Sequence, residues 1–87
     1  MKTFEDLEFE PHAGGMGGVM SRIYFENGYG ASVVKTDYTY GGRDGLYELA
    51  VLDSDGNLTY STPITDDVEG HLTEEDVTKL LEQIQSL

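Results

Sequence analysis

The alternation of apolar and polar residues predicts a hairpin in the first half of the chain. Two β-rich runs, Val19 to Phe25 and Gly30 to Thr36, flank the dipeptide Asn27-Gly28. Asn-Gly between such runs is a strong hairpin signal, because both residues of the tightest turn must take positive φ. With these two residues as the turn, Phe25 would oppose Gly30. Both faces of this hairpin are partly apolar, which predicts a central position in a sheet or cover on both sides.

A second hairpin is predicted between Leu46 and Thr62. Leu46 to Leu52 is a continuous strand-like run, and Asp53 to Asn57 carries the Asp, Ser, Gly and Asn residues that favour turns. Leu58 to Thr62 would be the returning strand, and Pro63 would end it because proline cannot donate to a ladder.

The N-terminal segment from Phe4 to Glu10 predicts an edge strand that ends at Pro11. Leu7 and Phe9 would share one face and the charged residues the other, and outward charges are one way to protect an edge from aggregation. The glycine-rich stretch from Ala13 to Gly18 follows. It lacks the Gly-Lys-Ser/Thr ending of a phosphate-binding loop, so it is interpreted as a flexible connector.

The C-terminal segment predicts a helix that begins after Thr73. Thr73 is a good N-cap, and Asp76 follows three residues later as in a capping box. Leu72 and Val77 are placed for a hydrophobic staple. The apolar residues of this helix follow the helical period, and they are Val77, Leu80, Leu81, Ile84 and Leu87.

These elements together predict one α+β domain over residues 1–87. Its sheet would be antiparallel with four or five strands, made of two hairpins plus the N-terminal edge strand. The single C-terminal helix would pack across one face of the sheet. A chain of 87 residues is long enough for one modest core and for one domain.

Charge narrows the range of partners. Seventeen Asp and Glu residues face five Lys and Arg residues, for a formal net charge of -12. Such a surface repels nucleic acid and anionic membranes and attracts basic surfaces. The basic residues are scattered along the chain, so the clustered cations that bind phosphates are missing. We therefore expect a basic protein surface as partner, with no direct nucleic acid and no membrane.

Cysteine content and the N-terminal sequence bear on the compartment. The chain has no cysteine, so disulfides and thiolate zinc sites are excluded. Its acidic start lacks the basic and apolar regions of a signal peptide. The expected location is the cytoplasm.

Catalytic, cofactor and metal sites receive little support from the sequence. It has no thiol, no Gly-x-Ser-x-Gly elbow and no His-Glu-x-x-His motif, so no enzyme activity and no cofactor are expected. The acidic run from Asp53 fails as a calcium loop, because Leu58 and Ile64 hold the positions that need glycine and glutamate. An acidic cluster ending at His71 could attract a divalent ion, but a solvated loop is the favoured interpretation, and no metal site is predicted.

Tyrosines in predicted loops are the best candidates for protein contact, since tyrosine offers a large contact area with a polar tip. For Tyr38 and Tyr40, packing over the core is an equally open alternative. Carboxylates flank these rings or surround the predicted start of the helix. The candidate partner-binding residues are Glu26, Tyr29, Asp37, Tyr38, Tyr40, Asp44, Asp66, Asp67, Glu69, Glu74, Glu75 and Asp76. A second acidic patch would comprise Glu5, Asp6, Glu8 and Glu10.

Three functional hypotheses follow from these features, and the one ranked last is a small metal-dependent or hydrolytic enzyme. In the first, the protein is an inhibitor whose acidic face occupies the basic groove of a nucleic-acid-handling enzyme and imitates phosphate charge. In the second, it is a structural or accessory interaction module without inhibitory activity, whose edge strands serve packing or strand addition. Steep salt dependence of binding would favour the first hypothesis.

Three stretches carry a resemblance to a known group of proteins. They are Asn27 to Val34, Leu46 to Leu52 and Thr62 to Val68. With the small size, the acidity and the lack of cysteine, they resemble an uncharacterised family of small acidic bacteriophage and prophage proteins. Anti-CRISPR inhibitors are similar in being short, acidic and often partner-blocking. The resemblance to the phage family carries no established activity. The similarity to anti-CRISPR inhibitors makes a host defence enzyme in the host-cell cytoplasm the target to test, and it implies no residue roles.

Overall fold

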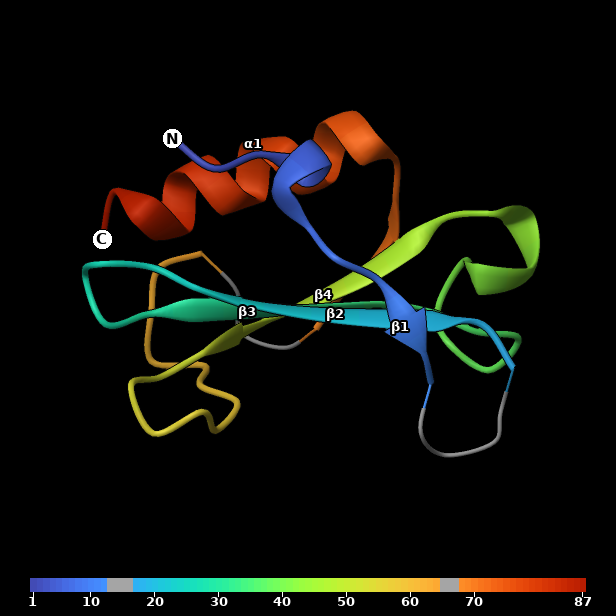
Figure 1. Ribbon diagram of the computed structural model, residues 1–87, viewed down its shortest axis with the longest axis horizontal. Helices are drawn as coiled ribbons and strands as arrows, with labels where there is room; N and C mark the ends of the chain where they lie inside the picture. Colours follow the sequence, from blue (N-terminus) through green and yellow to red (C-terminus); the bar gives the residue numbers. More distant parts are fainter. Residues whose placement is uncertain (13–16, 65–67) are drawn as a thin grey trace.

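A five-stranded antiparallel sheet and one C-terminal helix form the fold (Figure 1). The computed structural model describes residues 1–12, 17–64 and 68–87. The strands follow one another in the sheet in the order of the sequence, so each pairs with its sequence neighbour. They are β1 (Glu10–Pro11), β2 (Val19–Tyr24), β3 (Gly30–Lys35), β4 (Tyr47–Leu52) and β5 (Glu69–Leu72). The helices are α1 (Glu74–Gln85) and the short 3₁₀ helices η1 (Phe4–Asp6) and η2 (Gly42–Asp44). The predicted α+β fold class is confirmed.

The core lies between α1 and one face of the sheet. Val33 on β3 and Leu49 and Val51 on β4 are fully buried, and they form one cluster with Val77 and Leu81 of the helix. Alternate strand residues point to the same face, so this set follows directly from the antiparallel register. Ala50 and Leu52 are also buried, but their positions in β4 direct them to the other face.

Helix α1 begins as the sequence predicts. Thr73 is the N-cap, and its hydroxyl accepts a hydrogen bond from the Asp76 backbone N–H, while the Asp76 carboxylate accepts one from the Thr73 N–H. These two bonds complete the capping box. Val77, Leu81 and Ile84 are buried, whereas Leu87 lies beyond the helix end and stays exposed. The predicted stripe is therefore confirmed for the helix itself.

The first hairpin forms, but its predicted register is wrong by one residue. Tyr24, and not Phe25, pairs with Gly30. The loop has three residues: Phe25 donates to the Tyr29 carbonyl, and Gly28 donates back to the Phe25 carbonyl. Gly28 takes φ 91°, while Asn27 is not among the positive-φ residues, so only one turn residue is left-handed. This arrangement corresponds to a type I turn followed by a left-handed glycine.

The predicted second hairpin forms only in its first half. The turn from Asp53 to Asn57 is present, and the Asp53 side chain accepts hydrogen bonds from the N–H groups of Asp55 and Asn57. The expected return strand from Leu58 to Thr62 is absent except for one bridge between Leu52 and Leu58. The neighbour of β4 is instead β5, which the sequence interpretation assigned to an acidic connector.

The N-terminal segment pairs with the sheet only at its end. Residues Phe4–Asp6 form η1 rather than a strand, and only Glu10 and Pro11 pair with β2, so the predicted strand from Phe4 to Glu10 is wrong over most of its length. The predicted alternation holds, because Leu7 is buried, Phe9 is half-buried and their charged neighbours are exposed. The segment runs along α1, where the Phe4 N–H donates to the Thr78 hydroxyl.

Candidate functional site

The candidate residues separate onto two ends of the sheet. Glu26 and Tyr29 lie at the turn between β2 and β3, whereas Asp37, Tyr38 and Tyr40 lie in the connection between β3 and β4, at the other end (Figure 1). Strand β3 has six residues, which separates the two groups by about 20 Å. We call residues 36–46 the tyrosine loop, and it also contains the candidate Asp44.

Local hydrogen bonds determine the conformation of the tyrosine loop. Thr36 is buried, and its hydroxyl accepts from the Tyr38 N–H at 3.1 Å. The Thr39 hydroxyl accepts from the Thr36 N–H and donates to the Thr36 carbonyl, both at 3.0 Å. Threonine side chains favour such local turns. The Arg43 guanidinium then closes the loop by donating to the Asp37 carbonyl at 3.1 Å. The loop therefore has a defined conformation without any partner.

Contacts with β4 and β5 fix Tyr40 from two sides. Its backbone N–H donates to the carboxylate of Glu48 on β4 at 2.9 Å, and its carbonyl accepts from the His71 N–H on β5 at 3.0 Å. A Cβ added to Gly70 would lie 2.4 Å from the Tyr40 Cβ, so β5 approaches the loop closely only because residue 70 is glycine. Glu69, another candidate, is therefore one residue from the loop contact.

Glycine is also required inside the tyrosine loop. A Cβ added to Gly42 would lie 1.7 Å from the Thr36 carbonyl oxygen and 2.6 Å from the Thr39 hydroxyl. Apart from its chain neighbours, no atom of the described residues lies within 4 Å of a Cβ added at Gly45, although its φ of 79° still favours glycine. The loop thus folds back on its own start at Gly42, and this close approach orients the residues between Thr36 and Gly42.

Both tyrosines of this loop project into solvent. The exposed fraction is 73% for Tyr38 and 64% for Tyr40, so the alternative that they cover the core is wrong. Tyr29 differs, because it is half-buried and packs against the core cluster. Large exposed rings on an ordered loop can contact a partner with little loss of conformational freedom.

The carboxylates at the helix start serve the fold in part. Hydrogen bonds from the backbone and side chain of Thr73 hold the pKa of Asp76 below its usual value. Glu75 pairs with Lys79 at 3.6 Å, and both side chains are exposed. Glu74 is exposed in the first turn, where the helix dipole favours negative charge. Asp66 and Asp67 lie outside the described residues.

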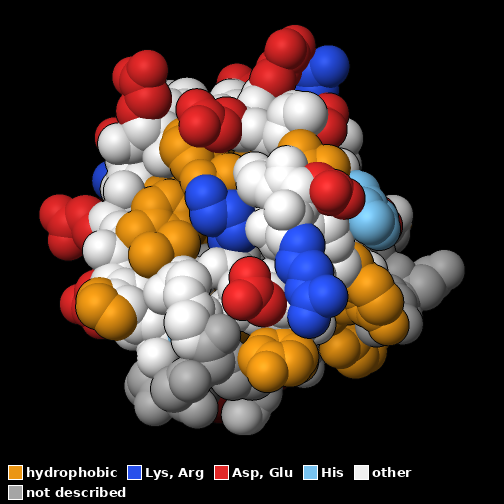
Figure 2. Space-filling model, turned by 90° about the vertical axis from the view of Figure 1, so that its right-hand side faces the viewer, with side chains coloured by type: hydrophobic (Ala, Val, Ile, Leu, Met, Phe, Trp, Pro, Cys, Tyr) orange, Lys and Arg blue, Asp and Glu red, His pale blue; other side chains and the backbone are white. Residues whose placement is uncertain are grey.

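The acidic side chains do not form one continuous strip. On the face that looks out from the loop end, most acidic side chains lie along the upper and left parts, others lie in the middle, and basic and hydrophobic side chains lie between them (Figure 2). Glu26 lies beside the C-terminal end of α1, since the side chain of its neighbour Asn27 donates to the Ile84 carbonyl at 2.8 Å. The helix has twelve residues, so the acids at its start lie about 18 Å away.

Three of the five basic side chains are engaged within the fold. The Lys35 ammonium lies 4.9 Å from the centre of the Tyr47 ring, Lys79 pairs with Glu75, and Arg43 closes the tyrosine loop. Because these cations already have contacts within the fold, most of the carboxylates are left to attract an external basic group.

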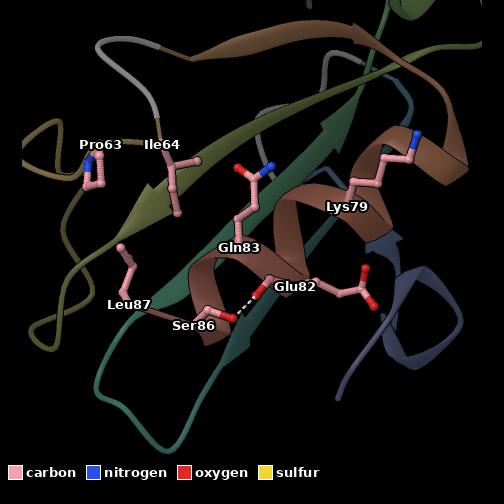
Figure 3. A pocket seen from close by; sticks show the side chains of 7 residues that line it. All are labelled: Pro63, Ile64, Lys79, Glu82, Gln83, Ser86 and Leu87. Atoms are coloured by element: carbon pink, nitrogen blue, oxygen red, sulfur yellow. Dashed lines mark hydrogen bonds between the residues drawn. The ribbon is translucent and has the colours of Figure 1, made fainter.

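The hollows of the surface offer no clear catalytic arrangement among the described residues. A groove of about 550 Å³ lies between α1 and the segment that contains Pro63 and Ile64 (Figure 3). Its described lining holds one carboxylate, Glu82, and no histidine, and the Ser86 hydroxyl donates to the Glu82 carbonyl. Within residues 1–12, 17–64 and 68–87, no three His, Asp or Glu side chains cluster as a metal would require.

Sequence reasoning missed Glu48 and His71 as positioning residues for the loop. The Glu48 carboxylate on β4 accepts a hydrogen bond from the Tyr40 N–H. His71 takes a left-handed conformation with φ 55° where the pairing of β5 with β4 departs from the regular register. No short-range pattern predicts either contact, because each depends on strand pairing. The spacing of Thr36 and Thr39 is a local turn signal that could have indicated the ordered loop.

No family model, curated protein or solved structure matches this chain. Among the described residues, none of the helices is both long and apolar enough to cross a lipid bilayer.

Proposed function

We propose that this protein binds a basic surface of a larger protein and that the tyrosine loop is the centre of the contact. Tyr38 and Tyr40 would supply apolar contact area, and Asp37, Asp44 and Glu69 would face the partner's cations. One observation carries this proposal: two large exposed rings project from a loop whose backbone is already fixed by hydrogen bonds.

Charge supports the choice of a basic partner. A net charge of -12 accelerates encounter with a cationic surface and disfavours nucleic acid as a direct ligand. Basic grooves of nucleic-acid-handling enzymes are surfaces of this kind. The protein would inhibit such a host defence enzyme by covering its groove, the mode of action toward which the similarity to anti-CRISPR inhibitors points, and it would act in the host cytoplasm without catalysis of its own.

The dispersed carboxylates refine this inhibitor proposal. Faithful imitation of a phosphate backbone needs a row of regularly spaced charges, and the candidate acids lie on two ends of the sheet. Blocking through an aromatic contact with acidic neighbours fits this arrangement better than imitation of phosphate geometry.

A pull-down from bacterial lysate tests the proposal. The bait is the intact protein at low and high salt, compared with the double variant Tyr38→Ala/Tyr40→Ala and with the control Tyr60→Ala, which removes another exposed ring outside the loop. We expect a nucleic-acid enzyme that is captured at low salt, released at high salt, displaced by DNA or RNA and lost with the double variant alone. Capture that survives the double variant would contradict the role of the loop.

The second function, an interaction module without inhibitory activity, is favoured by a different observation. Strand β1 covers only the first two residues of β2, which leaves part of a sheet edge unpaired. An activity assay on the captured enzyme separates the two functions, since an accessory module leaves that activity unchanged.

A further inference from the structure

We infer that the outer edge of β2, at Arg22 and Tyr24, is a strand-addition site for an extended, basic peptide segment of a partner. This surface is separate from the tyrosine loop, and the inference does not depend on the inhibitor proposal.

The register identifies which backbone groups face outward. Ser21 and Ile23 pair with Val33 and Ala31 of β3, in step with the hydrogen-bonded pair of Phe25 and Tyr29 at the turn. In an antiparallel ladder, hydrogen-bonded pairs alternate with non-hydrogen-bonded pairs. The N–H and C=O groups of Arg22 and Tyr24 therefore point away from β3, toward the outer edge.

The neighbouring strand does not reach these groups. Strand β1 pairs with Val19 and Met20 only, and the chain before it turns away along α1 (Figure 1). Within the described ranges, no backbone hydrogen bond joins this N-terminal segment to Arg22 or Tyr24. Both residues are exposed, and in the described part of the chain no backbone group is bonded to their outward N–H and C=O groups, as a partner strand requires.

Two hollows flank the open edge. One, of about 220 Å³, separates Glu8 and Glu10 from Met20 and Arg22, at the point where β1 and β2 diverge. The other, of about 620 Å³, lies beyond Tyr24 and is lined also by Lys2 and Glu26. A strand added to β2 would direct alternate side chains toward these spaces, as specificity pockets do in strand-addition complexes.

The lining of the first hollow includes a residue with a buried hydroxyl. Ser21 also lines it, and its Oγ is buried with no hydrogen-bond partner in the described part of the chain. Its side chain has an exposed fraction of 3%. Buried polar groups normally find partners, so the unpaired Ser21 hydroxyl is an unusual feature of this end of the sheet edge, although the atom itself is closed to solvent.

The charges around the open edge of β2 favour a basic peptide as its occupant. Glu8, Glu10 and Glu26 line the hollows, against Lys2 and Arg22. The net charge of -12 opposes pairing of this edge with a second copy of the chain, because like-charged surfaces would meet. A partner segment with alternating basic and β-branched residues satisfies both the charge and the pleat.

A proline substitution tests the inference directly. Arg22→Pro removes the outward N–H without touching the ladder to β3, and proline is tolerated where an edge N–H faces solvent. Arg22→Ala is the matched control, since it removes the side chain and keeps the N–H. The probe is a short labelled peptide of alternating lysine and valine, with a glutamate–valine peptide as its charge control.

We expect the lysine–valine peptide to bind Arg22→Ala at least as tightly as it binds the intact protein, because this variant also removes a positive charge from the edge. Arg22→Pro should bind the peptide about tenfold more weakly than Arg22→Ala, because the two variants differ in one backbone hydrogen bond. The glutamate–valine peptide should not bind. Equal binding by Arg22→Pro and Arg22→Ala, with both variants folded by circular dichroism, would overturn the inference.

Amide hydrogen exchange on the unmodified protein gives a test that does not depend on folding of a variant. The amides of Arg22 and Tyr24 should exchange much faster than those of Ser21 and Ile23, and the lysine–valine peptide should slow them selectively. Protection of Arg22 and Tyr24 without peptide, increasing with protein concentration, would show that a second copy covers the edge and would overturn the basic-peptide assignment.

Discussion

The two ends of the sheet use the same residue types for different purposes. At the β2–β3 turn, Tyr29 packs on the core, and the Asn27 side chain links the turn to the C-terminal end of α1. At the tyrosine loop, Tyr38 and Tyr40 project outward, and it is the backbone that is held. A tyrosine with a neighbouring carboxylate is therefore not by itself a sign of recognition. What distinguishes the loop is that its order comes from threonine and backbone contacts, which leaves the rings free.

Glycine substitutions should separate the two ends most strongly. Gly42→Ala should lower the free energy of unfolding by about 3 kcal/mol, because its Cβ would overlap the Thr36 carbonyl. Gly28→Ala at the turn should cost only about 1 kcal/mol, since its Cβ meets nothing closer than 3.9 Å and the cost is left-handed strain. Urea denaturation measures both values, and equal losses would contradict the described close approach in the tyrosine loop.

Removal of single rings should show the same contrast. Tyr29→Ala should cost about 2 kcal/mol of stability, because a half-buried ring leaves the core cluster. Tyr38→Ala should change stability by less than about 0.5 kcal/mol, as expected for an exposed side chain. Thermal and urea denaturation should agree on this order. A large loss with Tyr38→Ala would show that the ring supports the fold.

The capping box at the start of α1 allows a test of whether its acidic residue stabilises the fold. Thr73→Ala should lower stability by about 1 kcal/mol at neutral pH, because the N-cap is lost. The folded-state pKa of Asp76 is depressed, so its contribution is present above the unfolded-state pKa and is lost as pH falls through the folded-state pKa. The difference in stability between the unmodified protein and Thr73→Ala should therefore become smaller in acid. A difference that widened there would contradict the Thr73–Asp76 contact.

The smallest effect is expected from the contact of Glu48 with the Tyr40 N–H. Glu48→Gln keeps an acceptor but removes its charge, and charge-assisted hydrogen bonds are stronger than neutral ones. We expect a stability loss of about 0.5 kcal/mol and faster amide exchange at Tyr40. Exchange at Tyr29, whose N–H bonds the Asn27 side chain, serves as the internal control and should not change.

Local signals predicted the parts of the fold that depend on short-range chemistry. The capping box at Thr73 and the turn at Asp53 need only neighbours within four residues, and both form as predicted. The register of the first hairpin was wrong because Asn27-Gly28 fits two turn types, and the three-residue loop satisfies Gly28 without left-handed strain at Asn27.

Long-range pairing explains the rest of the differences. Strand β5 has only four residues and contains glycine and a left-handed histidine, so its sequence shows no β pattern. It forms because it can pair with the edge of β4. The loop contacts of Glu48 and His71 depend on that same pairing. The candidate tyrosines could be named from the sequence, but which rings project and which pack follows only from the fold.

Nuclear magnetic resonance can map directly whether the tyrosine loop is the contact surface. A protein captured from lysate would be purified and titrated into isotope-labelled protein at low salt. We expect the amide signals of Tyr38, Tyr40 and Glu69 to shift or broaden, while those of Glu26 and Tyr29 at the other end do not. Perturbation at Glu26 and Tyr29 with an unchanged tyrosine loop would contradict the proposal that this loop is the contact surface.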